Sequence, residues 1–304
     1  MYRRRPFKQF LYNLLRDNNF VFIVLAAILV SLQIFYPATE IYQRFINAIP
    51  YAFGWLVFAW VITDKSIQRR IFPYLGIFVV LFFEKSYWHL FYVLYPPEYV
   101  QSGSGAIADA LAWGSGRNGI LDPEWFNALE TAQYVFIVVK FIVIFVVFLT
   151  LWYLARPSDF RKMKTKKNLL ESKKMVLLVV ISFVMTMPHW LWKIAYRGFA
   201  QFFTHYWEAL PWSQLLFYGF PTAVAFILFA FIITKIQSKV KYLLYAIIGL
   251  LVVLPYLPME IIYSMHTNWT MQMLFATNIL INSVSYFFIF LSLLLLAKTK
   301  YIEQ

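Results

Sequence analysis

Long apolar runs alternate with short polar segments along the whole chain. Eight of these runs are long enough to cross about 30 Å of hydrocarbon at a rise of about 1.5 Å per residue. They lie at about 19–36, 48–63, 71–95, 133–155, 175–195, 213–234, 242–263 and 270–297. The pattern predicts an all-α, polytopic membrane protein with about eight transmembrane helices in a single integral membrane domain. No internal repeat is evident among the eight runs.

The distribution of basic residues predicts how these spans are oriented. Most of the 27 Lys and Arg residues fall within five segments that alternate with four poorly basic ones. The basic segments lie at 1–18, 64–70, 156–174, 235–241 and 298–300, whereas the segments between them hold Arg44, Arg117 and Arg197. Because basic residues concentrate on the cytoplasmic side, we expect both termini in the cytoplasm and the chain in the cell membrane.

Composition agrees with this interpretation. The chain is 62% hydrophobic and 13% charged, whereas soluble domains are about 45–50% apolar and about 25% charged. The net charge of +13 sits in short blocks beside the apolar runs, which favours a lipid bilayer as partner and no nucleic acid. The absence of cysteine excludes disulfides, thiolate metal sites and cysteine nucleophiles.

The longest predicted external loop is the glycine-rich segment 96–132. Within it, Asp122-Pro123 is a favourable helix start, with Asp as the N-cap and Pro at the first helical position. We therefore predict a short helix over 123–131 that leads into the fourth span. The aromatic segment 196–212 is expected to lie at the outer interface.

Ionisable side chains inside predicted spans are the candidate functional residues, because burying a charge in hydrocarbon is costly. Nearly all of them fall at the midplane or in the outer half of the bilayer. We therefore expect a polar cavity in the outer leaflet, covered by the 96–132 loop, which would serve proton relay or ligand binding. Its candidate residues are Glu84, Lys85, His89, Lys140, His189, Lys193, Glu260 and Asn278.

A purely structural role is the alternative for several of these groups. Glu84 and Lys85 are adjacent and point about 100° apart on a helix, so we expect each to pair with another helix. Glu84 would pair with Lys140, and Lys85 with Glu260. Lys193 would extend its ammonium group to the outer interface.

A metal or haem site is a further hypothesis. His89 and His189 are the histidines within predicted spans, and together they would ligate a b-type haem. With Glu84 or Glu260 they would instead form a site of two histidines and one carboxylate. No spacing motif supports either site, and the chain has no Walker, GxSxG or HExxH motif.

Three functions fit these residues. The first is an integral membrane subunit of a larger complex, respiratory or otherwise energy-transducing, whose buried groups relay protons, contact a quinone or pair with other subunits. The second is a small transporter or channel for an anionic solute, since lysine outnumbers glutamate within the spans. The third is a membrane enzyme acting on a lipid-linked substrate, with Lys140, Lys193 and Arg197 holding a phosphate and Glu84 or His189 as base. In each case Glu84→Gln and Lys140→Met should impair the protein more than Lys298→Met.

Overall fold

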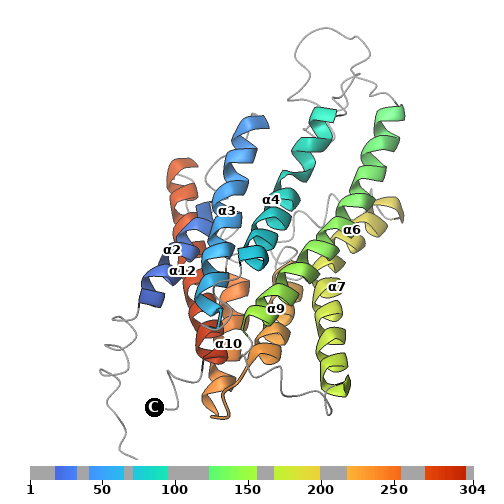
Figure 1. The fold of residues 1–304 in the computed structure, drawn as a ribbon. Helices are drawn as coiled ribbons and strands as arrows, with labels where there is room; N and C mark the ends of the chain where they lie inside the picture. Colours follow the sequence, from blue (N-terminus) through green and yellow to red (C-terminus); the bar gives the residue numbers. More distant parts are fainter. Residues whose placement is uncertain are drawn as a thin grey trace, which may run out of the picture.

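The computed structural model describes residues 18–32, 41–64, 71–94, 123–155, 168–198, 218–254 and 271–298. Within these ranges the chain is all-α, as predicted, and forms eight helices (Figure 1). They are α2 (Asn18–Ser31), α3 (Ile41–Ile62), α4 (Ile71–Leu94), α6 (Pro123–Leu154), α7 (Asn168–Gly198), α9 (Phe220–Ile233), α10 (Val240–Val253) and α12 (Met271–Ala297).

Several helices differ from their predicted bounds; α7, for example, begins at Asn168 and not at about 175. The second predicted span, 48–63, lies within a 22-residue helix that begins at Ile41. The apolar run begins later than the helix, because Gln43, Arg44 and Asn47 in its first two turns are polar. The predicted short helix over 123–131 is not separate, because α6 runs without a break for 32 residues from Pro123.

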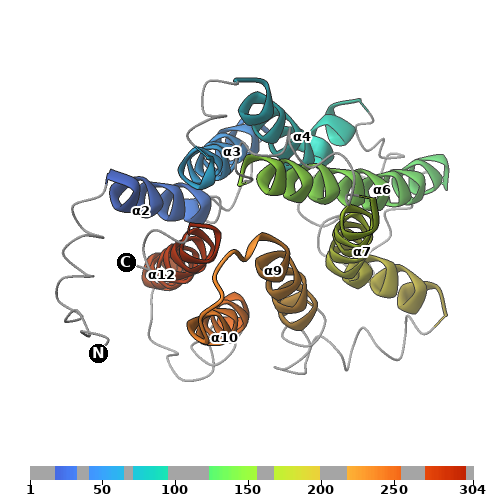
Figure 2. The same cartoon turned by 60° about the horizontal axis from the view of Figure 1, so that its bottom comes forward.

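The eight helices form a closed ring. Each helix packs against the next one along the chain, and α12 returns to α2 (Figure 2). Alternate helices α3, α6, α9 and α12 also contact one another around the ring interior. The bundle therefore has four inner helices, with α2, α4, α7 and α10 outside them.

Burial follows this division. The outer helix α10 buries one stripe, Leu244, Ile248 and Val252, with the four-residue spacing of a single helix face. The inner helix α9 instead buries residues on several faces, because it packs against α6, α7, α10 and α12. Its buried residues are Ala223, Ala225, Phe226, Phe229, Ala230, Ile232 and Ile233.

The two halves of the ring repeat each other, which corrects the expectation that the chain has no internal repeat. In α3 and α9, residues 52–63 (AFGWLVFAWVIT) match residues 223–234 (AVAFILFAFIIT). In α6 and α12, residues 145–156 (FVVFLTLWYLAR) match residues 287–298 (FFIFLSLLLLAK). The sequences around the first and fifth predicted spans also resemble each other, since residues 30–37 (VSLQIFYP) match residues 181–188 (ISFVMTMP).

Matching hydrogen bonds support the repeat. Thr63 and Thr234 donate to the carbonyl oxygens of Ala59 and Ala230 respectively, each one turn earlier. The hydroxyl of Tyr74 on α4 donates to Thr63 at 2.9 Å, and the hydroxyl of Tyr245 on α10 donates to Thr234 at 2.7 Å. The first four helices and the last four are therefore two copies of one arrangement.

Part of this bundle is long and apolar enough to cross a membrane. Two stretches, Thr131–Leu154 and Ala276–Ala297, meet both conditions within the described residues. Four shorter helices are also apolar, namely Asn19–Ser31, Ala48–Ile62, Phe220–Ile233 and Val240–Val253.

Within the described residues, the tightest contact between helices at a glycine lies between α2 and α3. A Cβ atom added to Gly54 would lie 2.7 Å from Val30 Cγ2 and 2.8 Å from the Ala26 carbonyl oxygen. It would also lie 2.8 Å from the backbone nitrogen of Val30. Backbone atoms cannot move aside as a flexible side chain can, so this position requires glycine.

We expect Gly54→Ala to lower the free energy of unfolding by about 1–3 kcal/mol, the usual cost of overpacking. Gly76→Ala is the matched control, because no atom lies within 4 Å of the added Cβ there. It should leave stability unchanged or raise it by up to about 1 kcal/mol through helix propensity. Thermal unfolding followed by tryptophan fluorescence measures both, and equal effects would contradict the close α2–α3 contact.

Candidate functional site

A buried glutamate pairs on α4 with a lysine whose side chain is 36% exposed. Glu84 is only 8% exposed, and its Oε2 atom lies 3.9 Å from the Nζ atom of Lys85. We expected each of these neighbours to pair with another helix, but they also lie close to each other, because the flexible lysine stem spans the angle between them. The Lys85 ammonium also lies 4.5 Å from the ring centroid of Tyr51 on α3, which adds a cation–π contact.

Lys140 on α6 belongs to the same cluster. It interacts electrostatically with both Glu84 and Lys85, and its Nζ atom lies 5.9 Å from the ring centroid of Phe136. Helices α3, α4 and α6 thus bring Glu84, Lys85 and Lys140 together, with two positive charges against one negative. We call these three residues the charged cluster.

Three buried polar atoms have no hydrogen-bond partner among the described residues. They are Trp55 Nε1 on α3, Ser86 Oγ on α4 and Ser285 Oγ on α12. Ser86 directly follows Lys85, while Trp55 is one turn beyond Tyr51 along α3. An unpaired buried polar group costs about 1–3 kcal/mol. Ser86 and Trp55 therefore have hydrogen-bonding capacity to offer a polar ligand near the charged cluster.

Asn278, a predicted site residue, accepts hydrogen bonds from a residue of its own helix. The Nδ2 atom of Asn282 donates to the Asn278 carbonyl oxygen at 2.8 Å and to its Oδ1 at 2.6 Å. Asn282 is buried whereas Asn278 is partly exposed. In the repeat, Asn282 matches Lys140, so both copies place a polar group at this inner position.

The remaining predicted site residues are not part of this geometry. The side chains of His89, His189 and Lys193, and the whole of Glu260, lie outside the described residues. The Lys85–Glu260 pair and the haem or metal site therefore stay predictions. Among the residues that the structure does describe, no three His, Cys, Asp or Glu side chains gather as metal ligands.

Aromatic rings from all four inner helices pack together nearer their C-terminal ends. Phe58 stacks on Phe290 with centroids 4.1 Å apart, and Phe148 lies 4.6 Å from Phe229. Trp55 and Phe226 join the two pairs: Trp55 lies 5.2 Å from Phe290 and 6.3 Å from Phe226, and Phe226 lies 5.7 Å from Phe148. We call these six residues the aromatic layer: Trp55, Phe58, Phe148, Phe226, Phe229 and Phe290.

The aromatic layer obeys the repeat. Trp55 matches Phe226, Phe58 matches Phe229, and Phe148 matches Phe290. All six side chains are buried. Two copies of one helical unit therefore meet through aromatic rings at the centre of the bundle.

The C-terminal ends of the inner helices are joined by hydrogen bonds into a C-terminal ring. The Asp64 N–H donates to the Leu154 carbonyl oxygen, and the matching Lys235 N–H donates to the matching Leu296 oxygen, both at 2.9 Å. Lysine side chains make the other two links. The Nζ of Lys235 donates to the Ala155 oxygen, and that of Lys298 donates to the Val61 oxygen at 2.6 Å.

These lysines satisfy a general need of helix ends. The last carbonyls of a helix have no intrahelical partner and carry partial negative charge, which an ammonium group complements. Desolvation lowers the pKa of Lys235, Asp64 opposes this shift, and the nearby Lys174 adds to it. Lys298, which we expected to matter less than Glu84 and Lys140, connects α12 to α3.

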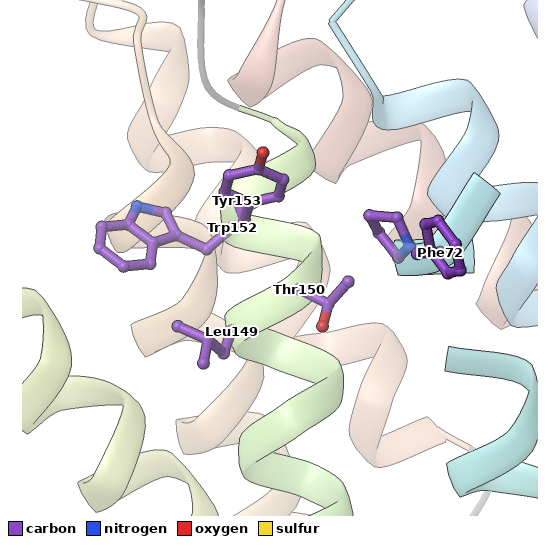
Figure 3. Close-up of a pocket in the computed structure, with 6 residues that line it drawn as sticks. Phe72, Leu149, Thr150, Trp152 and Tyr153 are labelled. Carbon is purple, nitrogen blue, oxygen red and sulfur yellow. The ribbon is translucent and has the colours of Figure 1, made fainter. Parts of the chain in front are cut away.

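A groove opens on the outer surface of the bundle between the start of α4 and the end of α6 (Figure 3). Its volume is about 560 Å³. The groove is at the C-terminal-ring end, so it is distinct from the charged cluster farther along α4. Its lining residues are Phe72, Pro73, Leu149, Thr150, Trp152 and Tyr153.

The charged cluster and the C-terminal ring lie at different depths. The Asp64–Leu154 hydrogen bond aligns α3 with α6. At about 1.5 Å per residue, Tyr51 and Lys140 both lie about 20 Å before that bond. The aromatic layer falls between these two levels.

No protein-family model matches the chain, and no curated protein or solved structure matches it either.

We expect Lys298→Met to lower the free energy of unfolding by about 1 kcal/mol. A hydrogen bond from a charged donor contributes about 1.5–3 kcal/mol, and partial exposure reduces this. Amide hydrogen exchange near the end of α3 should also become faster, because the Val61 carbonyl loses its link to α12. Lys241→Met is the control, since the Lys241 ammonium lies 5.2 Å from the Tyr242 ring centroid on α10. Identical exchange in the two variants would count against the link.

Proposed function

We propose that the chain is a polytopic membrane protein whose eight helices cross the bilayer, and that it is a small transporter or channel for an anionic solute. The membrane assignment is supported by the outer surface of the bundle. Large apolar side chains are exposed on every helix, including Phe72, Phe231 and Leu280. Water-soluble proteins rarely expose apolar surface so extensively, whereas lipid solvates it.

The basic segments suggest which end of the bundle faces the cytoplasm. The inner helices end at Ile62, Leu154, Ile233 and Ala297, one or two residues before the basic segments begin. The positive-inside rule then puts the C-terminal ring at the cytoplasmic side. The charged cluster, about 20 Å away, falls in the outer half of a bilayer of about 30 Å.

The charged cluster is the observation that carries the proposal. Buried charge at membrane depth is costly, and its usual explanation is a functional one. The repeat strengthens this argument at α6, because Lys140 matches the neutral Asn282 on α12 and the helix forms in both copies. Pro255 and Tyr256, which match Glu84 and Lys85 in the sequence, lie outside the described residues.

The charge balance of the cluster favours an anion. Among the described residues of the cluster, two lysines face one glutamate, so these three groups carry one positive charge in excess. An anion would complete the balance and would accept hydrogen bonds from Ser86 and Trp55, whose donors have no partner among the described residues.

The repeat also favours transport. Many transporters consist of two structural repeats, and parallel repeats are related by an axis along the membrane normal. Four spans in each copy give the two halves the same orientation. The aromatic layer would then be the closed cytoplasmic barrier of a central pathway, with the charged cluster on its external side.

A complex subunit remains the second candidate function, because the exposed apolar surface would also suit contact with partner subunits. The enzyme hypothesis depends on Lys193, Arg197 and His189, whose side chains lie outside the described residues. Mass measurement in mild detergent distinguishes the first two, since a subunit brings its partners and a transporter does not require them.

We expect the purified chain, reconstituted in liposomes, to transport one or more of chloride, formate and phosphate, and not potassium. Lys140→Met should reduce anion flux at least tenfold, because it removes a positive charge from the cluster. Lys241→Met should leave flux unchanged. Potassium flux equal to anion flux, or full anion flux in the Lys140 variant, would refute the anion proposal.

Removing a ring from the aromatic layer should increase the passage of anions through the bundle. Phe290 is fully buried in the layer, whereas Phe288 on the same helix is 42% exposed. Phe290→Ala should therefore raise basal anion leak severalfold in the same liposomes, and Phe288→Ala should not. Thermal unfolding of both variants controls for loss of structure, and a folded Phe290 variant without leak would argue against a central barrier.

A further inference from the structure

We infer that Lys235 and Lys298 form a gate between the two halves of the bundle, which opens when their hydrogen bonds to the opposite half break. The first half comprises α2, α3, α4 and α6, and the second comprises α7, α9, α10 and α12. The inference rests on the proposed transport function for the purpose of the motion, and it identifies the bonds that close the cytoplasmic side. We call the two lysine hydrogen bonds the lysine gate.

The links of the C-terminal ring fall into two classes. The backbone links, in which the N–H groups of Asp64 and Lys235 donate, each join two inner helices of the same half. The lysine links join the halves. The Nζ atom of Lys235 donates to the Ala155 oxygen at the end of α6, and the Nζ atom of Lys298 donates to the Val61 oxygen on α3. At this end, backbone bonds hold each half together, whereas side chains connect the second half to the first.

The two classes differ in how readily they break and form again. A backbone N–H is fixed to its helix, and a buried backbone group that loses its partner destabilises the protein. A lysine ammonium is carried on a flexible stem and can reach water at the membrane interface. Both lysine links are only partly buried. The lysine gate can therefore open while the backbone links within each half stay intact.

Each lysine link closes a boundary that an aromatic pair also crosses. Phe58 and Phe290 stack between α3 and α12, which are the helices that Lys298 joins. Phe148 lies against Phe229 between α6 and α9, which are the helices that the Lys235 side chain joins. Separation of two aromatic rings leaves no hydrogen bond unmade. The lysine gate therefore supplies the polar contacts that must break when these boundaries open.

The repeat separates the gate from the folding of each half. Lys235 matches Asp64, and an ionised carboxylate cannot donate a hydrogen bond to a carbonyl group. The backbone links that these two residues make are nevertheless equivalent, at 2.9 Å in both halves. The backbone link therefore belongs to the shared fold, whereas the ammonium link of Lys235 is an addition of the second half.

The packing around the ring allows such an opening. The halves also meet through α2 with α12 and through α6 with α7 (Figure 2). Rocking of one repeat against the other is a usual motion of transporters that consist of two repeats. Rocking about these two contacts would part the ends of the inner helices across the bundle centre, where the lysine gate lies.

The test measures distances between spin labels by double electron–electron resonance on the full chain in lipid nanodiscs. The chain has no cysteine, so introduced cysteines are the only labelled positions. Trp60→Cys with Phe231→Cys places labels at matched, exposed positions of α3 and α9, which lie in different halves. Trp60→Cys with Tyr153→Cys places labels at exposed positions of α3 and α6, within the first half.

We expect Lys235→Met with Lys298→Met to raise the population of longer distances between the halves at least threefold, with distances within the first half unchanged. Each single substitution breaks one link and should give the same change at smaller amplitude, which serves as the test if the double variant does not fold. Lys235→Arg with Lys298→Arg should keep wild-type distances, because a guanidinium group also donates. Lys241→Met is the control on the outer helix α10, where the ammonium group lies 5.2 Å from the Tyr242 ring centroid.

Unchanged distances between the halves in the methionine variants would overturn the inference. Equal lengthening of both label pairs would also overturn it, because the lysines would then stabilise the whole ring and not the boundary between the halves. The measurement requires no anion flux. Halves that separate in a chain without anion transport would refute the proposed function and uphold the lysine gate, so the two failures are distinguishable.

Discussion

The arrangement of the bundle depends on the hydrogen bonds made to carbonyl groups at four helix C-termini that lie close together. Helices α3, α6, α9 and α12 end together, and each end leaves up to about four carbonyl groups without an intrahelical partner. Four partial negative charges also converge there. The C-terminal ring resolves both problems, because backbone N–H groups and two lysine ammonium groups donate from one helix to the next.

The ring also sets the position of each side chain of the inner helices along the bundle axis. Once Asp64 is bonded to Leu154 and Lys235 to Leu296, the register between neighbours is set. Phe58 then meets Phe290, Phe148 meets Phe229, and Lys140 reaches the level of Tyr51. The aromatic layer and the charged cluster are thus consequences of one set of hydrogen bonds about 20 Å from the cluster.

Much of the helical content was predictable from the sequence, because apolar runs of sufficient length have few other structures available. The start of α3 was missed because Gln43, Arg44 and Asn47 interrupt the apolar pattern. The Glu84–Lys85 pair was missed because a fixed angle between adjacent residues ignores the length of a lysine side chain. The division into inner and outer helices was not predictable, since exposed and buried faces are equally apolar.

The repeat was visible in principle, in the strings FAWVIT and FAFIIT or FLTLWYLAR and FLSLLLLAK. Apolar spans share a small residue alphabet, however, so short matches carry little weight alone. The structure distinguishes this match because aligned residues make the same bonds, as Thr63 with Tyr74 and Thr234 with Tyr245 do.

Once the halves are known to be copies, their differences become informative. A feature that both copies keep, such as the aromatic layer or the threonine–tyrosine bond, is explained by the fold they share. Lys140 against Asn282 is different, because the same inner position accepts a neutral amide in one half and a cation in the other. Folding therefore does not require the charge. With Lys85 it leaves the described residues of the cluster one positive charge in excess of Glu84, and this excess is why we propose an anion as the ligand.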